Sequence, residues 1–171
     1  MTKEISVEVI AAKILEIRGK KVILDRDLAQ LYDVKTHRLN EQVKRNKRRF
    51  PADFMFQLTQ EEANILISHF AISSWGGTRK LPYVFTEQGV AMLSSVLNSE
   101  RAIEVNIMIM RAFTELREIL LTHKDLAIKL EALERKYANR DEKIKLIFEA
   151  IRQLLEPPGK ARAKPRIGFH T

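Results

Sequence analysis

The chain has 171 residues, 45% of them hydrophobic, which is enough for one folded domain and an extension. It contains no cysteine, which excludes disulfide frameworks and thiolate metal sites and fits the reducing cytoplasm where we expect the protein to act. No apolar run approaches the ~20 residues of a membrane span, and the first residues lack a signal-peptide core. The formal net charge of +8 favours nucleic acid or another anionic surface as a partner.

Residues 14–24 predict a β-hairpin. Two short runs rich in isoleucine, leucine and valine, at 14–17 and 21–24, flank a turn at Arg18, Gly19 and Lys20. Gly19 suits the corner because glycine tolerates a positive φ.

A short helix follows, and Asp25 is expected to cap it by accepting a hydrogen bond from an amide of the first turn. Leu28, Leu31 and Tyr32 form its apolar stripe, with the spacing of a helix that packs on a core. A turn at Asp33 separates it from a second helix, so that the two make a helix-turn-helix-like pair.

The second helix is expected to begin with Thr36 as its cap and to present Leu39 and Val43 inward, four residues apart. Phe50 precedes Pro51, and a residue before proline avoids the helical region. We therefore expect the second helix to end at this point.

This second helix is densely basic. Residues 35–49 contain seven lysines and arginines against one acid, Glu41, a local net charge of +6 within a chain total of +8. A solvated helix usually mixes the two signs, whereas a face of one sign suits a polyanion such as DNA. We interpret the segment as a recognition helix for the major groove of DNA. The alternative is a solvated helix that contacts an acidic partner protein.

The chemistry of the side chains suggests how they would share this task. Arg38, Gln42 and Asn46 carry groups suited to reading base edges. Phosphates are expected to contact the neighbouring charged residues, which are Lys44, Arg45, Lys47, Arg48 and Arg49, and Lys35 belongs to the same candidate set.

Beyond Pro51 the pattern predicts two strands, each followed by a helix. Residues 54–58 alternate as a strand, and residues 59–62 form a capping box that starts a helix. Residues 81–85 predict another strand, after which Thr86 caps a further helix.

A turn is predicted at residues 75–77, which read Trp-Gly-Gly. Arg79 and Lys80 lie beside it, where they could reach a phosphate backbone. The alternative is an ordinary surface turn, with Trp75 in the core.

Ser99 is expected to cap a helix of some fifty residues. From Leu116 onward the apolar residues repeat every seven, and ten of twelve seam positions are apolar, which is typical of a coiled coil and implies a partner helix. The apolar positions are Leu116, Leu130, Tyr137, Ile144 and Ile151 in one row, here called row a, and Ile119, Leu126, Leu133, Ile147 and Leu154 in a second, called row d.

Asp25 and Asp27 also permit a metal-dependent nuclease, with His37 or His69 as a helper. Helix capping and the helix dipole account for both aspartates, and no acid-plus-lysine motif or histidine cluster supports catalysis. We therefore expect no enzymatic activity, no metal and no cofactor.

Several long motifs resemble the phage "open reading frame six N-terminal" domain family over roughly residues 10–118. The motifs are LDRDLAQLY at 24–32, RLNEQVKRN at 38–46, RFPADFMFQL at 49–58, SSWGG at 73–77, LPYVFTEQGVAML at 81–93 and NSERAIEVNI at 98–107. The family is grouped with the KilA-N and Bro-N domains of phages and large DNA viruses. The resemblance implies a small α+β DNA-binding module, typically fused to variable C-terminal regions in antirepressor-like or regulatory proteins, often of prophage origin.

We therefore predict an α+β protein in three parts. Residues 1–115 form a helix-turn-helix-like DNA-binding domain with short β-hairpins, residues 116–156 a coiled-coil helix, and residues 157–171 a basic disordered tail. We expect a homo-oligomer that binds DNA as a prophage-type transcriptional regulator or antirepressor, with a phage or host regulatory protein as a further partner. The alternative is a coiled-coil adaptor that binds a repressor or another acidic protein without contacting DNA.

Overall fold

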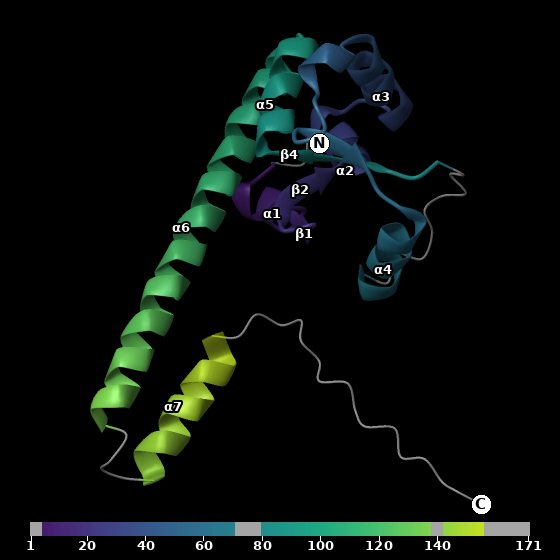
Figure 1. The fold of residues 1–171 in the computed structure, drawn as a ribbon. Coiled ribbons are helices and arrows are strands. Elements are labelled where there is room, and N and C mark those ends of the chain that lie inside the picture. Colours follow the sequence, from purple (N-terminus) through teal and green to yellow (C-terminus); the bar gives the residue numbers. More distant parts are fainter. Residues whose placement is uncertain (1–4, 71–79, 138–141, 156–171) are drawn as a thin grey trace, which may run out of the picture. The chain divides into compact units, whose positions relative to one another are not determined.

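A computed structural model describes residues 5–70, 80–137 and 142–155, and it has the predicted α+β class (Figure 1). The predicted turn at Trp75, the side chain of Arg79 and the predicted tail at 157–171 lie outside the described residues. By its internal contacts the chain divides into two compact units, residues 1–116 and 117–171. None of the helices in the described ranges is long and apolar enough to cross a membrane.

The elements alternate between short strands and helices before two longer helices. In chain order they are α1 (Val7–Ala11), β1 (Leu15–Ile17), β2 (Lys20–Leu24), α2 (Asp25–Tyr32), α3 (Thr36–Arg45), the 3-10 turn η1 (Lys47–Arg49), β3 (Met55–Gln57), α4 (Gln60–Phe70), β4 (Tyr83–Thr86), α5 (Glu87–Val96), α6 (Glu100–Tyr137) and α7 (Glu142–Leu155).

The four strands form one antiparallel sheet in the order β1-β2-β4-β3. The predicted hairpin of β1 and β2 is confirmed, with Leu15 opposite Val22. Its two-residue turn holds Arg18 at φ 53° and Gly19 at φ 70°, the pair of positive φ values that a tight twisted hairpin requires.

Hydrophobic side chains cover both faces of this sheet. On one face, Ile23 and Phe85 are fully buried in the main core, together with residues of α2, α3, α5 and the beginning of α6. On the other face, Val22 and Val84 pack with Leu66 of α4 in a smaller cluster. The sheet is thus a central layer, and α2 and α3 rest on its larger core.

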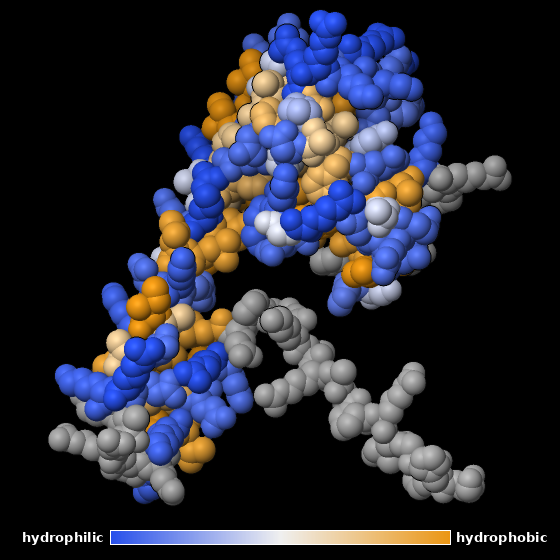
Figure 2. Space-filling model, in the orientation of Figure 1, coloured by the Kyte–Doolittle hydropathy of each residue, from blue (hydrophilic) through white to orange (hydrophobic). Residues whose placement is uncertain are grey.

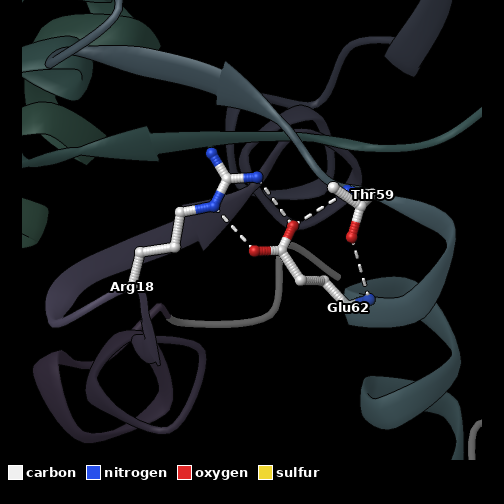
Figure 3. Close-up of polar contacts among 3 residues, drawn as sticks. All are labelled: Arg18, Thr59 and Glu62. Carbon is white, nitrogen blue, oxygen red and sulfur yellow. Dashed lines mark hydrogen bonds and ion pairs between the residues drawn. The ribbon is translucent and has the colours of Figure 1, made fainter.

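The predicted capping box at the start of α4 is confirmed (Figure 3). The amide of Thr59 donates to Glu62 Oε2 over 2.8 Å, and the amide of Glu62 donates to Thr59 Oγ1 over 3.2 Å. Arg18 adds two further bonds, from Nε and Nη2 to the two carboxylate oxygens of Glu62, at 2.6 and 2.8 Å. Arg18 and the amide of Thr59 together lower the pKa of Glu62 to about 2. The hairpin turn is therefore fastened to α4.

The predicted cap of α5 is also confirmed, because Thr86 Oγ1 accepts from the amide of Gly89 at 3.4 Å. The same hydroxyl donates to the carbonyl of Phe54 at 3.1 Å. A Cβ atom built on Gly89 would lie 2.2 Å from that carbonyl oxygen. Only glycine therefore lets the first turn of α5 approach this segment so closely.

Ser99 caps α6 as predicted, since its Oγ accepts from the amide of Ala102 at 3.2 Å. The prediction of one helix of some fifty residues is wrong, because α6 ends at Tyr137 and α7 begins at Glu142. The guanidinium of Arg152 donates to the carboxylate of Glu134, 18 positions earlier. In one continuous helix these residues would lie about 27 Å apart. Helix α7 therefore folds back beside the end of α6 within the second unit.

Candidate nucleic-acid interface

Helices α2 and α3 form the predicted helix-turn-helix-like pair. Asp33 ends α2 in the left-handed conformation, at φ 58° and ψ 44°, and so turns the chain toward α3. Leu39 and Val43 are buried and fix one side of α3 on the main core. The other side of α3 consequently faces solvent.

All seven basic side chains of residues 35–49 are exposed. Lys35 precedes α3, which carries Arg38, Lys44 and Arg45, and the remaining three lie in η1. Figure 2 shows hydrophilic residues over this part of the molecule, where Figure 1 places α3. The predicted set is thus brought together on one exposed segment.

The prediction that the basic helix ends at Phe50 is wrong, because α3 ends at Arg45. The side-chain amide of Asn46 donates to the carbonyl of Gln42 at 2.9 Å, and the backbone amide of Asn46 donates to the same carbonyl at 3.1 Å. These bonds terminate the helix and leave Asn46 and Gln42 half-buried. Residues 47–49 then form a tighter turn that no longer follows the spacing of α3.

Arg49 consequently points to a different neighbour than the arginines of α3. Its Nη1 donates to Ser95 Oγ of α5 at 2.8 Å. The bond ties η1 to α5, while the side chain stays exposed.

Glu41 joins the two arginines of α3. Its Oε1 accepts from Nη2 of Arg45 at 2.6 Å, and its Oε2 accepts from Nη1 of Arg38 at 3.4 Å. The arginine side chains are 71% and 66% exposed, for Arg38 and Arg45 respectively. All three side chains share one outward face, with the acid between the two cations.

The predicted cap residues of α2 and α3 are both wrong, although Asp25 does accept a hydrogen bond from an amide of the first turn, that of Arg26. Each helix starts directly from an extended residue, Leu24 or Lys35, and neither start has a side-chain cap bond. Asp25 is instead the first residue of α2 and is buried, and Thr36 is the first residue of α3. The sheet strand β2 runs straight into α2, which carries Asp25 into the interior.

The buried carboxylate of Asp25 binds α3 on the side that faces the core. It accepts from Asn40 Nδ2 of α3 and from the amide of Arg26, both at 2.8 Å. Burial raises the pKa of Asp25, although the hydrogen bond from Asn40 and backbone hydrogen bonds act in the opposite direction. Asn40 Oδ1 is itself buried without a hydrogen-bond partner. Asp25 and Asn40 thus form a polar link between α2 and α3.

The second aspartate considered for metal binding also has a partner. Asp27 Oδ1 lies 3.0 Å from Lys13 Nζ. Among the described residues, no three or more histidines, aspartates and glutamates gather where they could hold a metal ion.

Two contacts join α2 to the beginning of α6 within the first unit. Tyr32 Oη donates to Asn106 Oδ1 at 2.7 Å, and Arg101 Nε donates to the carbonyl of Leu31 at 3.4 Å. Burial raises the pKa of Tyr32. The sequence alone does not predict these contacts, although Asn106 is a polar residue within the apolar stretch 103–113.

Of the second candidate phosphate-binding pair, Lys80 is exposed and precedes β4. Arg79 lies outside the described residues.

The candidate oligomerisation residues fall into two groups by exposure. In row a, Leu130 is buried and Ile144 and Ile151 are half-buried, as are Leu116 and the neighbouring Phe148. The side chain of Tyr137 lies outside the described part of the chain. Row d is exposed, with Ile119 at 53%, Leu126 at 48%, Leu133 at 46%, Ile147 at 59% and Leu154 at 84%.

Comparison with known proteins identifies a domain family that includes the basic segment of the chain. Residues 12–96 match the family model of the ORF6N domain. The matched region begins before β1 and ends at Val96, the last residue of α5. It therefore contains the whole sheet, the helix pair and the basic segment. The curated proteins and the solved structures that were compared with the chain gave no match. With its basic helix-turn-helix-like pair inside the matched region, the chain belongs to the ORF6N domain family.

Proposed function

We propose that the protein binds duplex DNA through α3 and η1. The observation that carries this proposal is the set of seven exposed lysines and arginines at 35–49, which lie on α3, directly before it and in η1, while Leu39 and Val43 anchor the inner side of α3. Clustered cations gain affinity for DNA by displacing the counterions condensed on its phosphates. A rigid support keeps the cations in place for repeated contacts.

The dimensions of α3 support insertion into the major groove. An α-helix with its side chains is about 10–12 Å across, the major groove is about 12 Å wide, and the ten residues of α3 extend over about 15 Å. In this arrangement Arg38 and Gln42 would approach base edges, while Lys44, Arg48 and Lys47 would contact phosphates. Asn46 would contribute less to base reading, because its amide already bonds to Gln42.

We further propose that the protein acts in the cytoplasm as a prophage-type transcriptional regulator or antirepressor. Membership of the ORF6N family supports a phage-type protein. A regulator needs a DNA contact and a second interaction surface, and the helices of the second unit are candidates for the latter.

The second surface would bind a second copy of the chain. The fold-back of α7 covers part of row a, whereas row d remains exposed on both α6 and α7. Residues 117–155 contain nine basic and seven acidic residues, so two copies would repel each other only weakly. Pairing through row d would bury these side chains, and joining two DNA-binding units would raise the affinity for duplex DNA through avidity.

The exposed row d also supports the second candidate function, an adaptor that captures a regulatory protein. In that case the basic segment would dock on an acidic protein instead of DNA.

Amide chemical shifts test the proposed contact directly. The full chain labelled with ¹⁵N would be titrated with a random-sequence duplex. We expect the largest shifts within residues 35–49, and the double variant Arg45→Ala with Arg48→Ala should weaken the response. The control is Arg135→Ala with Lys145→Ala, which removes the same charge from exposed positions of the second unit. Equal weakening by both variants, or shifts confined to other segments, would contradict the proposal.

A further inference from the structure

Glu41 stands out in the basic segment because it is the one acid among residues 34–52. It lies on the outward face of α3, where it is flanked by Arg38 one turn before it and Arg45 one turn after it. A face that served phosphate binding alone would gain from a neutral or basic residue at this position, because a carboxylate is repelled by the DNA backbone.

Stability of the fold does not explain the acid. Exposed ion pairs, including pairs one helical turn apart, contribute about 0–1 kcal/mol to folding. Glu41 makes no hydrogen bond to the core in the described part of the chain, whereas its neighbour Asn40 bonds to the buried Asp25. The role of Glu41 therefore lies on the solvent side of α3.

The geometry gives the carboxylate a restraining effect on the two guanidinium groups. Each of its oxygens accepts from a different arginine, at 2.6 Å from Arg45 and 3.4 Å from Arg38. A phosphate that binds either arginine competes with Glu41 for the same donors. Contacts with the DNA backbone, which are the same for every sequence, are weakened as a result.

At particular sequences, contacts with the bases can offset the weaker contacts with the DNA backbone. In the major groove a glutamate accepts from the exocyclic amino group of cytosine, and a freed arginine donates to the O6 and N7 atoms of guanine. A C·G base pair beneath Glu41 would thus replace the ion pairs with base-specific hydrogen bonds. The amino group of adenine is also a donor in the major groove, but a base pair with adenine lacks the O6 and N7 pair of guanine that would receive the freed arginine.

We infer that Glu41 is the specificity-determining residue of the basic helix: it lowers affinity for arbitrary DNA and selects a cytosine at one position of the site. This inference rests on the proposed DNA binding. Glu41 would thus weaken binding to most DNA sequences, unlike the lysines and arginines around it, which would strengthen binding to all of them.

The test compares Glu41→Gln with Glu61→Gln, a control that removes the same charge from an exposed position in the first turn of α4. Binding of a random-sequence duplex would be measured against salt concentration. At about 50 mM salt we expect Glu41→Gln to bind on the order of tenfold tighter than the wild type, with a salt dependence steeper by about 0.9 for each arginine released. Glu61→Gln should stay close to the wild type.

Selection from a pool of randomised duplexes provides the second readout. The wild type should enrich a cytosine at one fixed position, and Glu41→Gln should lose that enrichment while keeping preferences elsewhere in the site. Equal random-duplex affinities for the two variants, or an unchanged cytosine preference in Glu41→Gln, would overturn the inference while leaving DNA binding intact. Failure of the wild type to bind any duplex at low salt would instead overturn the proposed function, and the inference with it.

Discussion

Asp25 is a buried carboxylate directly behind the basic helix, at the residue that starts α2. Burying a charge is costly unless its hydrogen-bonding capacity is used, and here the carboxylate accepts from Asn40 and from the amide of Arg26. The bond to Asn40 crosses from α2 to α3. The position of the basic face of α3 therefore depends on a side chain that faces away from it.

Two substitutions of Asp25 distinguish the effect of its hydrogen bond on stability from the effect of its buried charge. Asp25→Ala should lower the free energy of unfolding by about 1–3 kcal/mol, because it leaves the amide of Asn40 without its acceptor. Asp25→Asn keeps an acceptor oxygen and removes the buried charge, so it should be close to the wild type or more stable. Urea unfolding monitored by circular dichroism measures both. Equal destabilisation by the two variants would show that the charge itself is needed.

The pH dependence of this comparison has a definite sign. The pKa of Asp25 is raised in the folded state, so its contribution to stability is fully present below the unfolded pKa and is lost as pH rises through the folded pKa. The stability of Asp25→Asn relative to the wild type should therefore increase between about pH 4 and pH 7. Urea unfolding at both pH values tests this, and a difference that shrinks with rising pH would contradict it.

Among the elements, α5 is positioned by a close backbone approach rather than by side-chain packing alone. Gly89 lies in its first turn against the carbonyl of Phe54, and Ser95 of the same helix binds Arg49 of η1. Helix α5 thus connects the segment before β3 to the end of the basic segment.

Gly89→Ala tests this approach. Alanine normally stabilises a helix by about 1 kcal/mol relative to glycine, but its Cβ would lie 2.2 Å from a backbone oxygen. We expect a net loss of about 1–3 kcal/mol, the usual cost of overpacking, in urea unfolding. As a control, Ala91→Gly at an exposed position of the same helix measures the difference in helix propensity between alanine and glycine without any close approach. A stability gain in Gly89→Ala would refute the close approach.

These elements also show what the sequence could and could not predict. Local patterns were sufficient for the hairpin corner at Gly19, the capping box at Thr59 and the cap at Thr86, because each depends on residues within a few positions. The end of α3 was misplaced because Asn46 terminates the helix before the proline signal is reached. The bidentate bond from Arg18 to Glu62 spans 44 positions, so no local pattern could reveal it.

The same distinction applies to the candidate site. The basic segment was visible as a charge cluster, and the inward position of Leu39 followed from helical spacing. The links from Asp25 to Asn40 and from Tyr32 to Asn106 depend on how the helices pack. The seven-residue repeat is present on both α6 and α7. Because α7 folds back beside the end of α6, part of row a is covered within the same chain.

For the whole molecule, the two units carry different chemistry. The basic segment lies in the first unit, within the family match, and the exposed row d lies in the second, where the charges nearly balance. A near-neutral apolar row suits self-association, and a basic segment suits DNA. Dimerisation would then strengthen DNA binding without adding any contact to DNA.

Leu126→Glu tests the coupling at row d. Because this side chain is 48% exposed in the single chain, the substitution should leave the fold intact and convert a dimer to a monomer. Light scattering measures the mass, and DNA affinity should fall with it. Gln153→Glu adds the same charge at an exposed position outside row d and should leave both unchanged. A monomeric wild type, or a Leu126→Glu variant that remains dimeric, would contradict pairing through row d.

The most direct test of the central claim is the fluorescence anisotropy of a labelled random-sequence duplex, titrated with the full chain at several salt concentrations. We predict binding that weakens steeply with salt, with a log–log slope of about −0.9 for each phosphate contacted. Seven exposed cations at 35–49 make a slope of several such units the expected result. Absence of binding at low salt, or binding that does not change with salt, would contradict the assignment of this segment to DNA.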